Sequence, residues 1–393
     1  MRQKIFKWWR ATFPAATFGF ALFPALAVAA SVGCGAPAAM NDGWAVLSPQ
    51  QQHFDDALIC AIGPQLEKLP EGSPNGVVIV RHGVLVYEAY FTDHDQRWPE
   101  QHWGETPPSL PHDAGTKHDL QSITKSVVGL LVGIARDRGM INSVETPVLS
   151  FFPDYGDLDD PAKAQITVRH MLTMTAGLRW RYKPYLETAR LTDAAPDPYR
   201  FVLQQPLVRK PGTWWHYNNG SAEVVGGILQ RAAGRPLDQF AKEVLLDPLA
   251  ITDWEWGKMA SGKPAASWGL RLRPRDLAKI GQLVLDHGVW HSRQIVSAGW
   301  IKEMTTPQVI KPKFSFGHLW WLDRRSVAGH DFDLIYGSGW GGQCLYIVPS
   351  LDLVVVVMAG VHNFDGQGDQ NVAGDTVLTK FVLPAATDLV PAR

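Results

Sequence analysis

The alternation of apolar and polar residues predicts a β-hairpin near the start of the chain. Residues 77–81 and 84–91 are rich in β-branched and aromatic side chains, and His82-Gly83 between them suits a two-residue turn. Residues 50–68, just before, carry apolar side chains at helical spacing. We therefore expect a helix followed by two antiparallel strands.

A long helical pattern follows a polar, proline-rich loop over 92–118. Val127, Leu130, Leu131 and Ile134 recur at helical intervals, which predicts a helix over 122–138 with one buried side. Helical patterns recur in five later places: 168–174, the run after Asn219, 236–246, 274–285 and 297–305.

Strand-like runs return near the other end of the chain, at 317–322, 344–348 and 353–358, and a last helix is expected over 372–383. Sheet-forming segments at both ends with helices between them predict an α+β fold, an antiparallel sheet flanked by helices with an inserted, mostly helical subdomain. The domain is expected over 49–388, with an α/β part at 49–115 and 266–388 and a helical part at 116–265.

The first thirty residues differ from the rest. Four basic residues fall within the first ten, and an apolar stretch to about Ala30 follows, so 1–30 are expected to be a signal peptide and 31–48 a tether. Ala27-Val28-Ala29 offers a cleavage site, and Cys34 after Val32-Gly33 offers a rival site of lipid modification. The protein is expected to be exported, to the periplasm or outside the cell, and possible membrane attachment is confined to its N-terminus.

Composition and cysteine content narrow the class of protein. Of 393 residues, 46% are hydrophobic and the net charge is −1, with basic residues scattered, so a globular protein is expected and nucleic acid is excluded as a partner. If Cys34 is lost or acylated, only Cys60 and Cys344 remain. We expect both to be unpaired core thiols, because the sequence cannot place them within reach of each other.

Ser122-Ile123-Thr124-Lys125 opens the predicted helix over 122–138. The three-residue interval puts the serine and the lysine on one helical face. A serine hydroxyl is a weak nucleophile unless a base accepts its proton, and a buried lysine near the positive end of a helix can do so. The spacing also fits an N-cap serine followed by a solvated lysine, so it decides nothing alone.

Two later elements carry compatible chemistry. Tyr217 can shuttle a proton and Asn219 can orient a substrate carbonyl, although a core tyrosine with a turn asparagine has the same pattern. Glycines ahead of the strand 344–348 would let a backbone N–H approach a ligand, as an oxyanion donor must, unless they form a simple turn. The residues predicted to bind substrate or the oxyanion are Asn219, Trp340, Gly341, Gly342 and Gln343.

In this order, the three elements resemble the serine β-lactamase and penicillin-binding-protein superfamily, in its class C-like branch of esterases and 6-aminohexanoate-dimer hydrolases. Residues 166–178 are similar to that branch's ITxRHLLTxTSGL stretch, and 269–278 to its GLRxTxxDLA segment. The resemblance covers nearly the whole mature chain and implies a β-lactamase/transpeptidase-like fold.

The resemblance also implies hydrolysis of esters or amides through an acyl-enzyme. Ser122 would attack after losing its proton to Lys125 or Tyr217. Because the two would act as a coupled pair, the sequence does not decide which of them is the primary base. The N–H groups of Ser122 and Gln343 would hold the oxyanion. No cofactor is expected, and neither is a metal, because the thirteen histidines show no ligand spacing.

The third element departs from the family pattern. β-Lactamases and D-alanyl peptidases usually have Lys-Thr-Gly there, and Trp340-Gly341-Gly342 lacks that cation. A charge-assisted hydrogen bond contributes about 1.5–3 kcal/mol, so neutral or differently charged small esters, amides or peptide-like compounds are favoured over penicillins. Arg179, Arg181 and Lys183, which follow Gly177-Leu178, could instead meet an acidic end of the substrate, unless they are solvated surface charges. A β-lactamase, a D-Ala-D-Ala carboxypeptidase and a catalytically silent envelope-binding module remain as alternatives, and the oligomeric state stays open.

Overall fold

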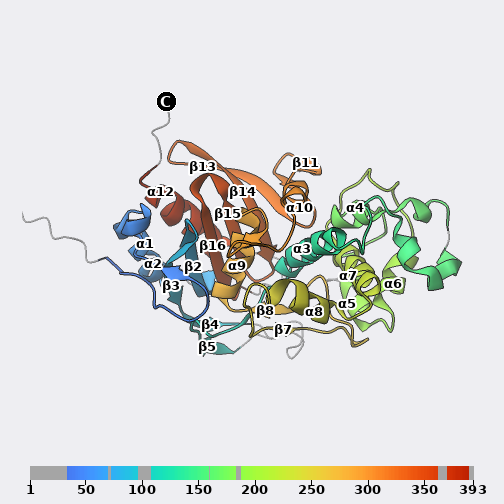
Figure 1. Ribbon diagram of the computed structural model, residues 1–393, viewed down its shortest axis with the longest axis horizontal. Helices are drawn as coiled ribbons and strands as arrows, with labels where there is room; N and C mark the ends of the chain where they lie inside the picture. The colour runs from blue at the N-terminus through green and yellow to red at the C-terminus, as the bar shows by residue number, and fades with distance from the viewer. Residues whose placement is uncertain are drawn as a thin grey trace, which may run out of the picture. The chain divides into compact units, whose positions relative to one another are not determined.

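The computed structural model of the chain describes residues 33–69, 72–95, 108–158, 160–182, 187–361 and 370–388 (Figure 1). Within them a nine-stranded sheet has the order β1-β3-β2-β16-β15-β14-β13-β12-β11. Its strands are β1 (Ala45–Val46), β2 (Pro74–Arg81), β3 (Val84–Tyr90), β11 (Val309–Lys311), β12 (Phe314–Phe316), β13 (Trp321–Val327), β14 (His330–Gly339), β15 (Gln343–Val348) and β16 (Leu353–Ala359). All neighbours are antiparallel except β1 and β3.

Three small sheets and a set of helices complete the described part. The small sheets pair β4 (Thr92–His94) with β5 (Ser109–Pro111), β6 (His118–Asp119) and β7 (Glu255–Trp256) with β8 (Leu270–Leu272), and β9 (Val289–Trp290) with β10 (Arg293–Gln294). The α-helices are α1 (Asp56–Cys60), α2 (Ile62–Leu66), α3 (Ile123–Asp137), α4 (Val168–Leu172), α5 (Glu187–Ala194), α6 (Pro198–Gln204), α7 (Asn219–Ala233), α8 (Leu237–Ala241), α9 (Pro274–Leu285), α10 (Ala298–Met304), α11 (Val372–Thr376) and α12 (Leu383–Ala385).

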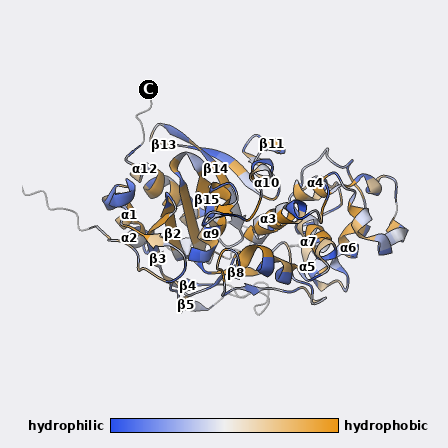
Figure 2. Ribbon diagram, in the orientation of Figure 1, coloured by the Kyte–Doolittle hydropathy of each residue, from blue (hydrophilic) through white to orange (hydrophobic). Residues whose placement is uncertain are grey.

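The central strand β16 shows why the sheet is covered on both faces. Its side chains alternate between two apolar clusters, Val354 and Val356 packing with α9 and α3, Val355 and Val357 with α1, α2 and α12. Successive strand residues point to opposite faces, so a strand buried on both sides is apolar throughout. The orange centre of the sheet in Figure 2 reflects this burial.

The helical part, green and yellow in Figure 1, holds α4 to α8, with α7 packed against α3, α4, α6 and α8. The helix α3 also contacts β14 and β15, so it lies at the seam between the helical part and the sheet. Nearly all of α3 is buried, from Ile123 to Ala135. This buried helix therefore positions Ser122, the residue just ahead of its first turn.

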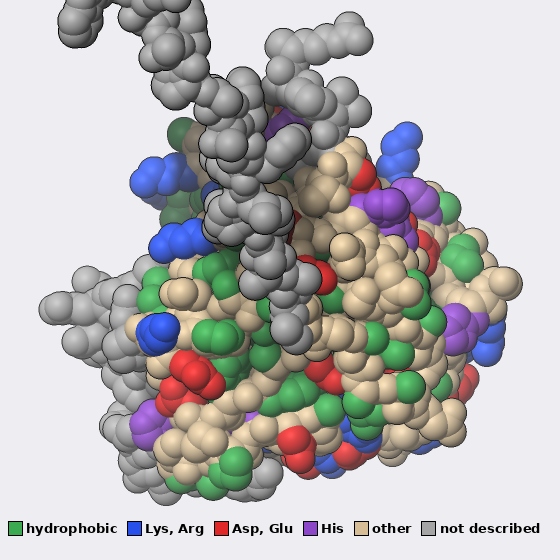
Figure 3. All heavy atoms as spheres, turned by 90° about the vertical axis from the view of Figure 1, so that its left-hand side faces the viewer, with side chains coloured by type: hydrophobic (Ala, Val, Ile, Leu, Met, Phe, Trp, Pro, Cys, Tyr) green, Lys and Arg blue, Asp and Glu red, His purple; other side chains and the backbone are tan. Residues whose placement is uncertain are grey.

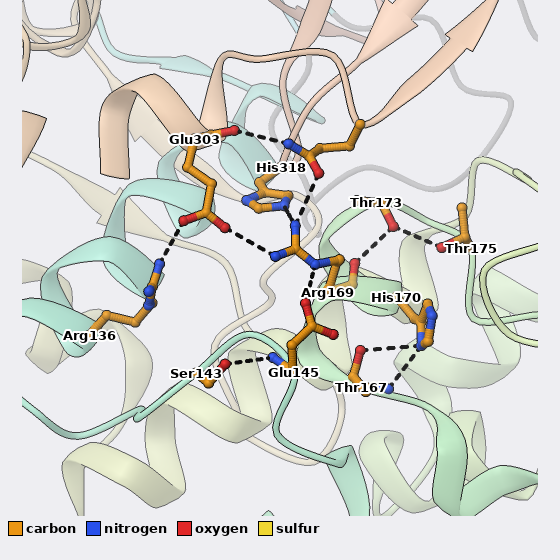
Figure 4. Close-up of polar contacts among 11 residues, drawn as sticks. Arg136, Ser143, Glu145, Thr167, Arg169, His170, Thr173, Thr175, Glu303 and His318 are labelled. Carbon is orange, nitrogen blue, oxygen red and sulfur yellow. Dashed lines mark hydrogen bonds and ion pairs between the residues drawn. The ribbon is translucent and has the colours of Figure 1, made fainter. Parts of the chain in front are cut away.

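An ionic network ties the two parts together (Figure 4). Arg169 of α4 binds Glu145, approaches Glu303 of α10 at 3.3 Å and lies 3.3 Å from His318 Nε2. Burial and the neighbouring Arg169 and Arg136 lower the pKa of His318 to about 3, so its imidazole is neutral. The network holds the start of the helical part against the segment that follows α10.

Most expected elements are confirmed. The hairpin is β2–β3, the helix over 122–138 is α3, and 274–285 is α9. The helix expected over 50–68 is broken into α1 and α2. The strand expected over 317–322 is wrong, since β12 ends at Phe316 and β13 begins at Trp321, with a turn between them. That turn needs Gly317, because a Cβ there would lie 2.1 Å from the carbonyl oxygen of Met304.

The expectation of two unpaired core thiols is wrong for Cys60 and confirmed for Cys344. Cys34 forms a disulfide with Cys60, with the two Cα atoms 5.4 Å apart, and Cys344 is a buried thiol. The pairing was missed because Cys34 was assumed to be lost or acylated. Much of the expected tether is also fixed on the domain: Arg275 donates to the carbonyl of Ala38 at 2.7 Å, and β1 pairs with β3.

None of the helices in the described part of the chain has the length and apolar character needed to cross a bilayer. On the face drawn in Figure 3, basic, acidic, histidine and apolar side chains of the described residues are interspersed.

Candidate active site

Ser122 and Lys125 lie together at the start of α3. Lys125 Nζ donates to Ser122 Oγ at 2.8 Å and to the carbonyl oxygen of Ser267 at 2.8 Å. The lysine is only 2% exposed. Ser122 precedes the first helical residue, but its side chain caps no backbone N–H. The interpretation as an N-cap serine with a solvated lysine is therefore wrong. The Ser122 hydroxyl instead accepts a hydrogen bond from the buried amine of Lys125.

The turn that presents Ser122 is tightly held. Gln121 has φ 48°, a left-handed conformation uncommon for a residue with a Cβ, and its N–H donates to Asp119 Oδ1 at 2.8 Å. The end of β14 passes close by, because a Cβ on Gly339 would lie 2.4 Å from the carbonyl oxygen of Leu120. Only a glycine permits this approach between the third element and the serine turn.

Tyr217 and Asn219 face the same cavity as Ser122. Asn218 caps α7 by accepting from the N–H of Ser221 at 2.7 Å, which fixes the residues on either side of it. The Tyr217 ring stacks on Trp321 with centroids 5.6 Å apart, and Lys125 Nζ lies 5.2 Å from the Tyr217 ring centroid. The structure thus brings the first two sequence elements together around one serine.

Sequence reasoning missed Glu223, which is fully buried on α7. Its two carboxylate oxygens accept from the N–H groups of Ala266 at 2.8 Å and Ser267 at 2.9 Å. Burial raises the pKa of Glu223, while these hydrogen bonds and Lys125 oppose the rise. Glu223 therefore fixes the segment whose Ser267 carbonyl receives the lysine. An acidic residue in the otherwise apolar and small-residue run of α7 was the available signal.

Asp193 on α5 was also missed, and it lines the cavity. Burial raises its pKa to about 7, with Glu223 adding to the rise, while a 3.3 Å hydrogen bond from Trp268 Nε1 opposes it. The cavity therefore has an acid that changes charge near neutral pH.

The cavity has a volume of about 420 Å³. Aromatic side chains form much of its wall, and none of the described residues that line it is Lys, Arg or His. The lining residues are Gln121, Ser122, Tyr182, Ala189, Asp193, Tyr217, Asn219, Ser267, Trp268, Trp321, Tyr336, Ser338, Gly339, Trp340, Gln370 and Asn371.

The third element enters the cavity earlier in the chain than expected. The strand β14 was missed, and its end brings Ser338, Gly339 and Trp340 to the cavity wall. Gly341, Gly342 and Gln343 are not among the lining residues, because Gly341-Gly342 turn the chain back into β15. The Gln343 side chain instead bonds the backbone of Ala359.

Two of the three basic residues singled out beyond 178 do not reach the cavity. Arg179 and Arg181 are exposed and are not among its lining residues. Lys183, which follows them in the sequence, lies outside the described residues.

A serine bonded to a buried lysine, beside a tyrosine at the seam of a sheet and a helical part, is the arrangement of an acyl-transferring serine hydrolase. The family model described as Beta-lactamase matches residues 67–373, and the chain belongs to that family.

Two comparisons show the range of similar proteins. The chain is 25% identical over 283 residues to the 6-aminohexanoate-dimer hydrolase of Paenarthrobacter ureafaciens, covering 62% of this chain and 66% of that protein. It is 25% identical over 188 residues to esterase EstB of Burkholderia gladioli, covering 45% of each. The chain therefore matches just under two thirds of the first relative's length and less than half of the second's.

Solved structures share the fold over a longer span. A structure titled as a putative 6-aminohexanoate-dimer hydrolase from Bacillus anthracis superposes with a TM-score of 0.66 at 21% identity, covering 83% of each chain. A family VIII carboxylesterase superposes with a TM-score of 0.63 at 18% identity, covering 81% of this chain and 95% of the other. The expected β-lactamase-like α+β fold is confirmed.

Proposed function

We propose that this protein is a serine hydrolase that cleaves neutral esters or amides through an acyl-enzyme on Ser122. The observation that carries the proposal is the 2.8 Å hydrogen bond from a buried Lys125 to Ser122 Oγ. Burying an amine costs folding free energy unless hydrogen bonds or opposite charges compensate it. A binding module without catalysis would therefore have no physical reason to retain this pair. Membership of the Beta-lactamase family supports the same reaction class.

In the proposed reaction, Ser122 Oγ forms a bond to the substrate carbonyl carbon while its proton passes to the Lys125–Tyr217 pair. The N–H groups of Ser122 and Trp340 stabilise the oxyanion, since Trp340 lines the cavity and Gln343 does not. The bond to the alcohol or amine then breaks as the pair returns the proton to the leaving group. Water attacks the acyl carbon, releases the acid and restores the serine.

The charge of the cavity supports neutral substrates. Its described lining has no cationic side chain and one acid, Asp193, so nothing there compensates a substrate carboxylate. The aromatic wall of Tyr182, Trp268, Trp321 and Tyr336 favours an apolar acyl or alcohol group. A β-lactamase or D-Ala-D-Ala carboxypeptidase activity is the second candidate, and the missing cation disfavours it.

The test is intact mass after incubation with a fluorophosphonate or a penicillin, with p-nitrophenyl butyrate turnover in parallel. We expect one phosphonyl label and ester turnover, both lost in Ser122→Ala and kept in Ser150→Ala, a serine outside the cavity. A stable penicilloyl adduct would instead support the cell-wall activity. Full labelling of Ser122→Ala, or no label at all on the folded protein, would refute the proposal.

We also propose that the protein is exported. The disulfide between Cys34 and Cys60 supports this, because such bonds persist in oxidising compartments. Disulfide-bonded Cys34 is unavailable for acylation, so we expect cleavage after Ala29 and no lipid. Mass spectrometry of the mature protein from a cell-envelope fraction tests this: an N-terminus at Ala30 supports the proposal, and a diacylglyceryl mass on Cys34 contradicts it.

A further inference from the structure

Three polar side chains outside the cavity lie together in the interior. Asp95 follows β4, His112 follows β5 and His118 belongs to β6. One ligand atom from each lies within 4.8 Å of the others, and the three residues are only 6%, 9% and 0% exposed. A carboxylate and two imidazoles are a common ligand set for zinc in proteins.

The orientation of His112 suits metal binding. Its Nε2 lies 3.1 Å from the carbonyl oxygen of Asp93, and a carbonyl only accepts, so Nε2 carries the proton. The other nitrogen, Nδ1, is then a lone-pair donor, and it is buried with no hydrogen-bond partner. A hydrogen bond from the non-ligating ring nitrogen, such as that of His112 Nε2 to Asp93, is what normally fixes the tautomer of a metal-ligating histidine.

His118 has the same unsatisfied character. Both of its ring nitrogens are buried and neither has a hydrogen-bond partner. Nδ1 lies 3.4 Å from Asp95 Oδ2, close to the separation of about 3.3 Å between two ligands of a tetrahedral zinc ion. A buried polar group left unpaired costs about 1–3 kcal/mol, so a partner for these nitrogens is expected.

The charged groups around these three residues are compatible with a bound cation. Arg271 interacts electrostatically with Asp95 and opposes a positive ion, but a second buried carboxylate, Asp119, interacts with both of them. Arg271 is also paired with Glu255 at 3.1 Å. Two buried carboxylates thus lie near one guanidinium, so Arg271 does not by itself exclude a cation.

We propose that Asp95, His112 and His118 bind a zinc ion that fastens the β4–β5 hairpin to β6. Because β6 leads through Gln121 directly to Ser122, the ion would stabilise the turn that presents the nucleophile and take no part in the reaction. The proposal replaces the expectation, drawn from sequence spacing, that the chain has no metal ligands.

The test uses the full mature chain without a histidine tag. After removal of metal with a chelator, zinc is titrated in competition with a chromophoric chelator, and metal content is measured by mass spectrometry. We expect one zinc per chain and a higher thermal midpoint with zinc than without. Asp95→Asn, His112→Gln and His118→Gln should each lose the bound zinc and the zinc-dependent shift, whereas His330→Gln, outside the cluster, should keep both.

Wild-type protein that binds no zinc would overturn the proposal. Equal zinc binding by wild type and all three cluster variants would overturn it as well. The wild-type titration needs no variant to fold, and near-ultraviolet circular dichroism checks each variant. Fluorophosphonate labelling of Ser122 is measured separately, so failure of the metal site is distinguishable from failure of the hydrolase.

Discussion

Two buried polar clusters flank Ser122 along the chain, and they differ in how well they are satisfied. After the serine, Lys125 donates to Ser122 and Ser267, and Glu223 accepts from two backbone N–H groups. Before it, His112 Nδ1 and both ring nitrogens of His118 have no hydrogen-bond partner. The first cluster is complete in the sense that the charged side chains of Lys125 and Glu223 both have hydrogen-bond partners, which suits a preorganised catalytic site. The second lacks a partner, which suits a ligand site.

Removing the lysine breaks the complete cluster at its centre. Lys125→Met keeps much of the side-chain volume but removes the amine that contacts Ser122, so kcat/KM for p-nitrophenyl butyrate should fall by about 10²–10⁴. The exposed Lys242→Met should leave kcat/KM unchanged, and Ser122→Ala sets the floor. A Lys125→Met enzyme within threefold of wild type would transfer the role of base to Tyr217 alone.

The sequence predicted the complete cluster better than the incomplete one. Ser122 and Lys125 are three residues apart on one helix, so local spacing already places them together. The proposed ligands Asp95, His112 and His118 lie in or just after three short strands, and the pairing of β4 with β5 and of β6 with β8 positions these strands. Glu223 and Asp193 likewise acquire their roles from distant contacts that a single sequence does not show.

The fold follows the same division. Regular apolar patterns predicted β2, β3, β16 and α3, because each of these elements buries apolar side chains at the spacing typical of a strand or a helix. The strand β14 was missed because His330, Asp331 and Asp333 interrupt its apolar pattern and glycines lie near its end. Its place in the sheet comes from pairing with β13 and β15. Because β14 was missed, the sequence analysis expected Gln343 as the oxyanion donor, whereas the proposed donor is Trp340, which lines the cavity.

Glu223→Gln would make the complete cluster resemble the incomplete one. The amide presents one donor group to the N–H of Ala266 or Ser267, leaving a buried N–H unpaired, so the free energy of unfolding should fall by about 1–3 kcal/mol. Displacement of the Ser267 carbonyl should also lower kcat, by up to about 100-fold. Urea unfolding and steady-state kinetics measure both. The control is Glu243→Gln, because Glu243 is exposed and forms ion pairs with Arg138 and Arg235. Equal effects in the two variants would argue against this role of Glu223.

The effect of Asp193→Asn should appear in the pH dependence of stability. The pKa of Asp193 is raised to about 7, so between about pH 4 and pH 7 the folded protein keeps a proton that the unfolded chain has lost. This acid therefore costs stability as the pH rises through that window, by at most about 1.4 kcal/mol per pH unit, and the cost is constant above it. Asn has no such cost, so the stability of the variant relative to wild type should grow from about pH 4 to about pH 7 and then level off. Urea unfolding across this range measures the difference, with the exposed Asp331→Asn as control. A difference that does not vary with pH would mean that Asp193 ionises normally, and the cavity would then carry a full negative charge at neutral pH.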